Sequence, residues 1–289
     1  MVEAGLISSG IIAPFLVVLR ESIEAALIVG IMWAYLDKIE RPEYKKYLLY
    51  GSLAAIISSI SLGGVIIITL GELSGFWQKA FEGVASITAT IVLTYVIVWM
   101  SQHARTIKGE LERKTAYGIV KLYGAKTSVN AIIILAFVAV AREGLETVLF
   151  LTPLLSIDLG STLVGSILGI GVALALSLAA KRGIYNMDIG KFFSYTSLIL
   201  IIFAAGLFGY GIHELIEAAE VSGIESPLFE KAWDINQESK DHPLHEKGIV
   251  GSFAKALVGY DGNPEILRVM GYVIYWVVVG SYWRKTYRN

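Results

Sequence analysis

Two short segments of the sequence share the pattern Arg-Glu-x-x-Glu, and each lies inside a long apolar run. Residues 20–24 read R-E-S-I-E and residues 142–146 read R-E-G-L-E. Residues three apart on a helix share one face, with Cβ atoms roughly 5–6 Å apart. Each segment therefore points two carboxylates the same way, and carboxylate oxygens are ligands that hard cations prefer. The pattern predicts a cation site.

Charged side chains in the middle of an apolar run need a reason, because a charge at the bilayer centre costs about 2.5–3.5 kcal/mol on insertion scales. If the two segments cross inside a membrane, their carboxylates converge on one ion. Neither apolar run contains histidine, so the site is all-oxygen and suits a hard ion such as ferric iron better than copper or zinc. Arg20 and Arg142 then balance excess negative charge while the site is empty. The predicted metal ligands are Glu21, Glu24, Glu143 and Glu146.

A structural interpretation of the same residues is that each segment forms a salt bridge that holds helices together. A single buried Arg–Glu pair fits that interpretation well. Two copies of one pattern, each with a second glutamate left over, favour the ion site instead.

The composition excludes several classes of protein. Of the 289 residues, 55% are hydrophobic and 17% are charged, against about 25% charged in a typical soluble domain. The net charge of -1 gives no basic field that attracts nucleic acid. The absence of cysteine excludes disulfides, zinc–thiolate sites and iron–sulfur ligation. We expect an all-α integral membrane protein with a single transmembrane domain over residues 1–289.

Seven segments are long and apolar enough to span a bilayer, which takes roughly 20 residues. The N-terminal run is expected to be a retained helix and not a signal peptide, because residues 1–10 lack lysine and arginine. The predicted spans are Ile11–Tyr35, Tyr47–Leu70, Gly83–Ser101, Ala131–Leu155, Ser161–Ala180, Phe192–Ile216 and Ile266–Trp283.

Lysine and arginine are concentrated in alternate loops, which predicts an outside N-terminus and a cytoplasmic C-terminus in the plasma (inner) membrane. The two acidic segments lie in spans one and four, so spans one to three and four to six form a repeat. Three helices per copy is an odd number, and the second copy must therefore be inverted. The expected layout is repeat 1 at about 8–105, repeat 2 at about 128–220, an outer loop at about 217–265 and helix seven at about 266–284.

Further acidic and histidine side chains lie at the ends of spans that face outside in this topology. Glu72 and Glu82 are expected to bracket the second loop, and the others follow the sixth span or lie in the outer loop. They are either an acidic vestibule that concentrates cations or an ordinary solvated surface. The candidate outer metal-capture residues are Glu72, Glu82, His213, Glu214, Glu217, Glu220, Asp234, His242 and His245.

The two acidic segments together resemble the oxidase-coupled iron permease family, which includes the fungal high-affinity iron permease and the bacterial elemental-iron uptake permease. The family hallmark is an R-E-x-x-E motif in the first and fourth membrane helices, and the resemblance covers about residues 5–285. Further matching stretches are Phe81–Gly83, Trp99–Met100, Gly206–Leu207, His213–Leu215, Trp233–Asp234, Gly248 and Gly259–Pro264.

The resemblance implies iron import through the four motif glutamates, by a transporter and not an enzyme. Iron is then the transported ion and no cofactor is tightly bound. The resemblance implies a separate ferroxidase or an extracytoplasmic iron-delivery protein as partner. A homo-oligomer is a further expectation, which the resemblance does not supply. The alternatives are transport of another cation such as manganese or lead, proton-coupled cation exchange, and an intramembrane di-metal oxidoreductase, which generally needs histidine ligands.

Overall fold

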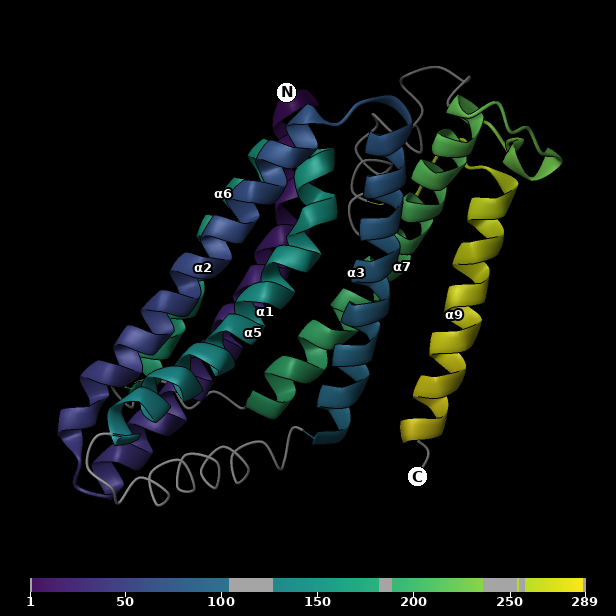
Figure 1. The fold of residues 1–289 in the computed structure, drawn as a ribbon. Coiled ribbons are helices and arrows are strands. Elements are labelled where there is room, and N and C mark those ends of the chain that lie inside the picture. Colours follow the sequence, from purple (N-terminus) through teal and green to yellow (C-terminus); the bar gives the residue numbers. More distant parts are fainter. Residues whose placement is uncertain (1, 104–126, 182–188, 236–253, 255–257, 288–289) are drawn as a thin grey trace.

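The computed structural model describes residues 2–103, 127–181, 189–235, 254 and 258–287 (Figure 1). Within this part of the chain there are seven long helices and two short 3-10 helices. The predicted all-α fold and the predicted number of seven long helices are therefore confirmed. The elements are α1 (Val2–Lys38), η1 (Pro42–Tyr44), α2 (Lys45–Glu72), α3 (Gly75–His103), α5 (Thr127–Ile157), α6 (Leu159–Lys181), α7 (Ile189–Val221), η2 (Pro227–Phe229) and α9 (Ile266–Tyr287).

The helices have the length and surface of membrane spans. Stretches within α2, α3, α6 and α7 are each long and apolar enough to cross a bilayer, whereas the apolar stretch of α9 is shorter. In α1 and α5 the two acidic segments interrupt the apolar run. Large apolar side chains are exposed on α2 and α6, for example Ile60 at 70% and Ile167 at 69%. A continuous apolar surface of this kind fits lipid and not water, so the chain is a multi-pass membrane protein.

One predicted boundary is wrong. The loop between the second and third spans was expected to run from Glu72 to Glu82, but α3 begins at Gly75 and Glu82 lies two turns inside it. The connection is only residues 73–74, followed by Gly75 at a φ of +59°. The stretch that follows, with Phe76 and Trp77, continues as helix because its aromatic side chains suit the membrane interface.

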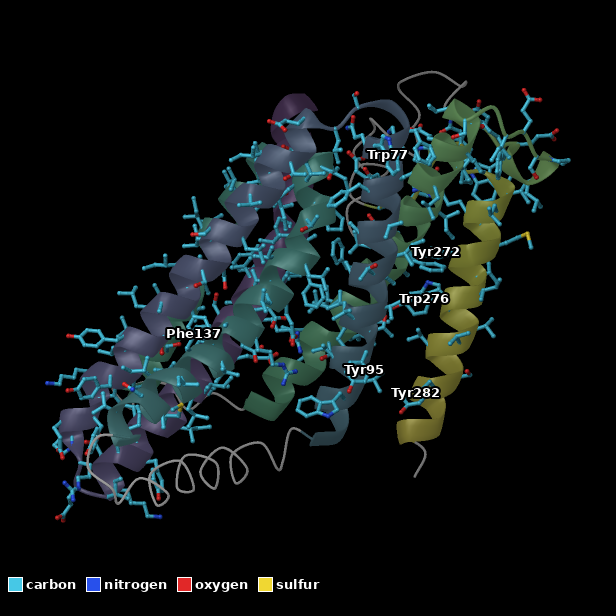
Figure 2. All side chains as sticks on the ribbon, viewed as in Figure 1. Trp77, Tyr95, Phe137, Tyr272, Trp276 and Tyr282 are labelled. Atoms are coloured by element: carbon cyan, nitrogen blue, oxygen red, sulfur yellow. The ribbon has the colours of Figure 1, made fainter. Side chains whose placement is uncertain are left out.

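Helices from the two halves of the chain pack in pairs. The most extensive contacts join α1 with α6, α2 with α5 and α3 with α7, while α9 lies along α7 (Figure 1). Figure 2 labels Tyr272 and Trp276 on α9, whose ring centroids are 6.4 Å apart. A buried cluster that includes Val17, Leu93 and Phe150 connects α1, α3 and α5 in the middle of the molecule.

Glycines permit the close approach within these pairs. A Cβ on Gly165 of α6 would lie 2.5 Å from the carbonyl oxygen of Ile11 in α1. A Cβ on Gly51 of α2 would lie 2.3 Å from the carbonyl oxygen of Ile133 in α5. Small residues at such contacts bring helix backbones together in lipid.

We expect Gly165→Ala to destabilise the protein, because the new methyl group meets backbone that cannot move without separating α1 from α6. Overpacking of this kind costs about 1–3 kcal/mol. Gly171→Ala in the same helix is the matched control, since nothing lies within 4 Å of its Cβ position. Thermal unfolding in detergent measures both variants, and equal melting temperatures would refute the close contact.

The turn between α5 and α6 is fixed by a helix cap. Oδ1 of Asp158 accepts a hydrogen bond from the Ser161 amide at 3.1 Å, and Oδ2 accepts one from the Ser161 hydroxyl at 2.6 Å. These hydrogen bonds hold the pKa of Asp158 below its ordinary value. The cap therefore stabilises the fold above the ordinary aspartate pKa and loses its effect as the pH falls through the lowered value.

Candidate metal centre

Three of the four motif glutamates meet where α1 passes α5. One carboxylate oxygen each from Glu21, Glu143 and Glu146 lies within 4.8 Å of the others. The Glu21 and Glu143 residues are buried, at 1% and 5% exposure. The helical spacing that puts Glu143 and Glu146 on one face of α5 directs both toward Glu21 on α1, so oxygens from two helices surround one small space.

The fourth glutamate, Glu24, lies outside this group and is held by arginine. Nη1 of Arg20 lies 2.5 Å from Oε1 of Glu21, and Nη2 lies 2.8 Å from Oε1 of Glu24. The contact with Glu24 is an ion pair without the geometry of a directed hydrogen bond. Arg20 itself is fully buried. In this structure its guanidinium therefore bridges both carboxylates of its own segment.

Arg142 occupies the same motif position in α5 but has different surroundings. Its side chain is 52% exposed, and its Nε donates a hydrogen bond to Oε1 of Glu146 at 2.9 Å. Its guanidinium carbon lies 5.4 Å from the ring centroid of Trp99 in α3, a cation–π distance. Both arginines pair with glutamates of their own segment, but Arg20 is buried and Arg142 is accessible.

The cluster contains carboxylate oxygens that lack partners. In the described part of the chain, the second oxygens of Glu21, Glu143 and Glu146 are buried and accept no hydrogen bond. No arginine or lysine there lies within ion-pair distance of Glu143. Leaving buried carboxylate oxygens unpaired is costly. A bound cation removes that cost, and a cluster of this kind is suited to hold one.

A glycine lets a third helix approach this cluster. The middle residue of the second motif, Gly144, lies against Ser59 of α2, and a Cβ there would be 2.0 Å from the serine hydroxyl. Neither Ser59 nor the Trp99 contact with Arg142 follows from sequence spacing. In the sequence, only the glycine between the two motif glutamates hints at the contact with Ser59. Only the aromatic residue near the end of a span hints at the contact with Arg142.

Several candidate outer residues are not brought together. Glu82 is buried and its two oxygens accept hydrogen bonds from Gln78 at 3.0 Å and Tyr210 at 3.2 Å. This carboxylate is already satisfied within the fold. Of the remaining candidates, His242 and His245 lie outside the described residues, and three are exposed, namely Glu72, Glu220 and Asp234.

The other three outer candidates do form a cluster, at the end of the bundle where α3 and α9 begin (Figure 1). Donor atoms of His213, Glu214 and Glu217 in α7 lie within 4.8 Å of one another. Two residues that the sequence did not single out join them. Lys79 of α3 places its Nζ 3.0 Å from Glu214 and 2.6 Å from Glu217. Nδ1 of His213 lies 3.0 Å from Oε1 of Glu265.

Glu265 immediately precedes α9, and its ionisation is favoured by this contact. Burial alone would raise the pKa of the carboxyl. The hydrogen bond with His213, a backbone hydrogen bond and the charges of His213 and Arg268 together outweigh burial and hold the pKa below its usual value. Its position directly after Pro264, at the start of a helix, is the sequence signal that could have identified it.

Comparison with known proteins matches most of the chain to one family. Residues 11–287 match the Iron permease FTR1 family. The chain is 38% identical over 88% of its length to an uncharacterised protein of Archaeoglobus fulgidus, covering 87% of that protein. It is 32% identical over 91% of its length to proteins named ferrous iron permease EfeU, covering 89% of the one from Yersinia pestis and 91% of the one from Escherichia coli O6:H1. No solved structure matches.

Proposed function

The chain belongs to the FTR1 family of iron permeases, and from that premise we propose that it imports iron through the carboxylate cluster between α1 and α5. It is a transporter and not an enzyme. The observation that carries the proposed site is the set of three buried carboxylate oxygens, from Glu21, Glu143 and Glu146, that accept no hydrogen bond in the described structure. An iron ion is the cargo that offsets their charge.

Glu24 is the fourth ligand in this proposal. Its carboxylate is held by Arg20 beside the cluster, and it becomes available when the arginine turns away. The carboxylates then bind the transported ion together, while the arginines compete with the ion for the same carboxylates. Such competition keeps binding weak enough for release, which transport requires.

The inverted repeat is part of the proposal, and the helix pairs support it. α1 packs on α6 while α5 packs on α2, so each first helix meets the second helix of the other half. Ile11 and Ile133 approach glycines on those partners. Ile11 and Ile133 are separated by the same number of residues as Arg20 and Arg142, so they occupy equivalent positions in the two halves. Small rocking of the two repeats about the shared site would open it alternately to each side.

The proposed sidedness places the N-terminus outside and the C-terminus in the cytoplasm of the plasma membrane. The basic loops carry this assignment, since lysine and arginine accumulate on the cytoplasmic side. Iron then arrives at the end of the bundle where α3 and α9 begin, delivered by a separate ferroxidase or an extracytoplasmic iron-binding protein. No tightly bound cofactor takes part.

Transport of another cation, such as manganese or lead, is the second candidate. An oxygen-only site favours it, because hard and intermediate cations share this ligand preference. Proton-coupled exchange uses the same carboxylates. A di-metal oxidoreductase is disfavoured, since neither α1 nor α5 supplies histidine among its described residues.

Uptake of radioactive iron into proteoliposomes tests the proposal. Ferrous iron, kept reduced with ascorbate, and ferric citrate are supplied in parallel, with manganese as competitor. We expect iron accumulation above that of protein-free vesicles for at least one oxidation state, with excess manganese competing weakly. The absence of uptake in both oxidation states, or complete inhibition by equimolar manganese, would contradict an iron permease.

A further inference from the structure

The cluster of His213, Glu214, Glu217, Glu265 and Lys79 lies at the end of the bundle where α3 and α9 begin. It contains more ligand groups than its internal contacts use. We propose that His213, Glu214 and Glu217 form a second metal site, for a divalent transition ion. In this proposal Glu265 orients the His213 ring through the other ring nitrogen, and Lys79 is a tethered cation which the ion displaces. This site is separate in composition and in helices from the carboxylate cluster of α1 and α5, and it does not depend on that cluster carrying iron.

The donor set suits a divalent transition ion. The imidazole of His213 lies between two carboxylates, with Nε2 3.3 Å from Oε1 of Glu217 and Nδ1 3.0 Å from Oε1 of Glu265. Imidazole with carboxylate oxygens is a ligand set for ions such as Fe²⁺, Co²⁺ and Zn²⁺. A carboxylate on one ring nitrogen also orients the ring while the other nitrogen binds a metal.

A buried oxygen without a hydrogen-bond partner points to a ligand here. Within the described residues, Oε2 of Glu214 accepts no hydrogen bond, and the Glu214 residue is 3% exposed. The same carboxylate has a donor oxygen within 4.8 Å of donor atoms of His213 and Glu217. A metal ion bound among these three groups would satisfy the buried oxygen.

Lys79 supplies the positive charge that the cluster needs without a metal. The Glu214 residue is only 3% exposed, and the Lys79 ammonium lies 3.0 Å away without the geometry of a directed hydrogen bond. The short contact to Glu217, at 2.6 Å, is at the rim, where that side chain is 36% exposed. Lys79 is itself 32% exposed. A compact ammonium on a flexible stem can leave toward solvent while a divalent ion takes over the charge.

Removing the tethered cation is therefore expected to strengthen metal binding. In purified protein carrying Glu143→Gln, which silences the cluster of α1 and α5, Lys79→Gln should tighten Co²⁺ binding about tenfold. Lys79→Arg, which keeps the charge, should not. Adding His213→Gln should abolish the absorption bands of imidazole-bound Co²⁺. Lys45→Gln is the matched control, because that lysine pairs with Asp37 at the opposite end of the bundle.

Unchanged or weaker Co²⁺ binding in folded Lys79→Gln protein would overturn the proposal, as would binding that persists after His213→Gln. A second measurement uses the unaltered chain, in case Lys79→Gln does not fold. Co²⁺ should increase the rate at which an amine-reactive ester modifies Lys79, read by mass spectrometry, and leave Lys45 unchanged. A Lys79 rate that does not respond to Co²⁺ would show that the lysine is a fixed structural ion pair.

Discussion

Glu143→Gln and Glu21→Gln are each expected to lower iron uptake about 100-fold, because either substitution replaces a charged oxygen ligand by a neutral amide. Glu143 is the cleaner test. No arginine lies within ion-pair distance of it in the described structure, so its neutralisation leaves no buried cation without a partner. Glu21→Gln leaves Arg20 paired with Glu24, and both variants should insert and fold.

Uptake is compared at equal amounts of protein in the vesicles, after size-exclusion chromatography shows the same elution for variant and parent. Glu225→Gln, at an exposed position between α7 and η2, is the matched control and should transport normally. Wild-type uptake by both cluster variants would show that the carboxylates of α1 and α5 are not on the ion path.

Arg20→Met and Arg142→Met are expected to differ widely in stability, although the two arginines occupy the same place in the motif. Arg20 is fully buried and holds two carboxylates. Removing one partner of a buried ion pair costs about 3–5 kcal/mol, because the remaining charges are left uncompensated. Arg142 is 52% exposed and holds one carboxylate, and exposed pairs contribute about 0–1 kcal/mol.

Thermal unfolding in one detergent at one pH compares the two arginine variants directly. The melting temperature of Arg20→Met should fall well below that of Arg142→Met, and saturating Mn²⁺ should narrow the gap by balancing the charge that Arg20 leaves. Equal losses would mean that the two motifs share one environment, which contradicts the burial of Arg20.

The number of long helices could be predicted from the sequence, because run length and helical period are local properties. The meeting of the two motif helices entered the prediction only as a condition, because helix packing depends on the whole fold. Which carboxylates meet could not be predicted. Spacing puts Glu21 and Glu24 on one face of α1. The packed structure shows that Glu24 pairs with Arg20 and lies outside the group of three carboxylates. The place of Glu82 was missed because aromatic interface residues can end a span or extend its helix, and the structure extends it.

No pattern in the sequence separates the nine outer candidates from one another. Their separation into exposed, satisfied and clustered groups depends on how α3 lies against α7, which sets Lys79 between Glu214 and Glu217. A single lysine near an acidic surface has no periodic signal. Its partners are visible only after the helices are packed.

Anomalous scattering at the iron absorption edge, from crystals of the protein loaded with iron under reducing conditions, locates the bound ion. An iron peak is expected within bonding distance of carboxylate oxygens from Glu21 on α1 and from Glu143 and Glu146 on α5. A peak confined to the cluster around His213, with the three carboxylates in their metal-free positions, would contradict an iron site between α1 and α5.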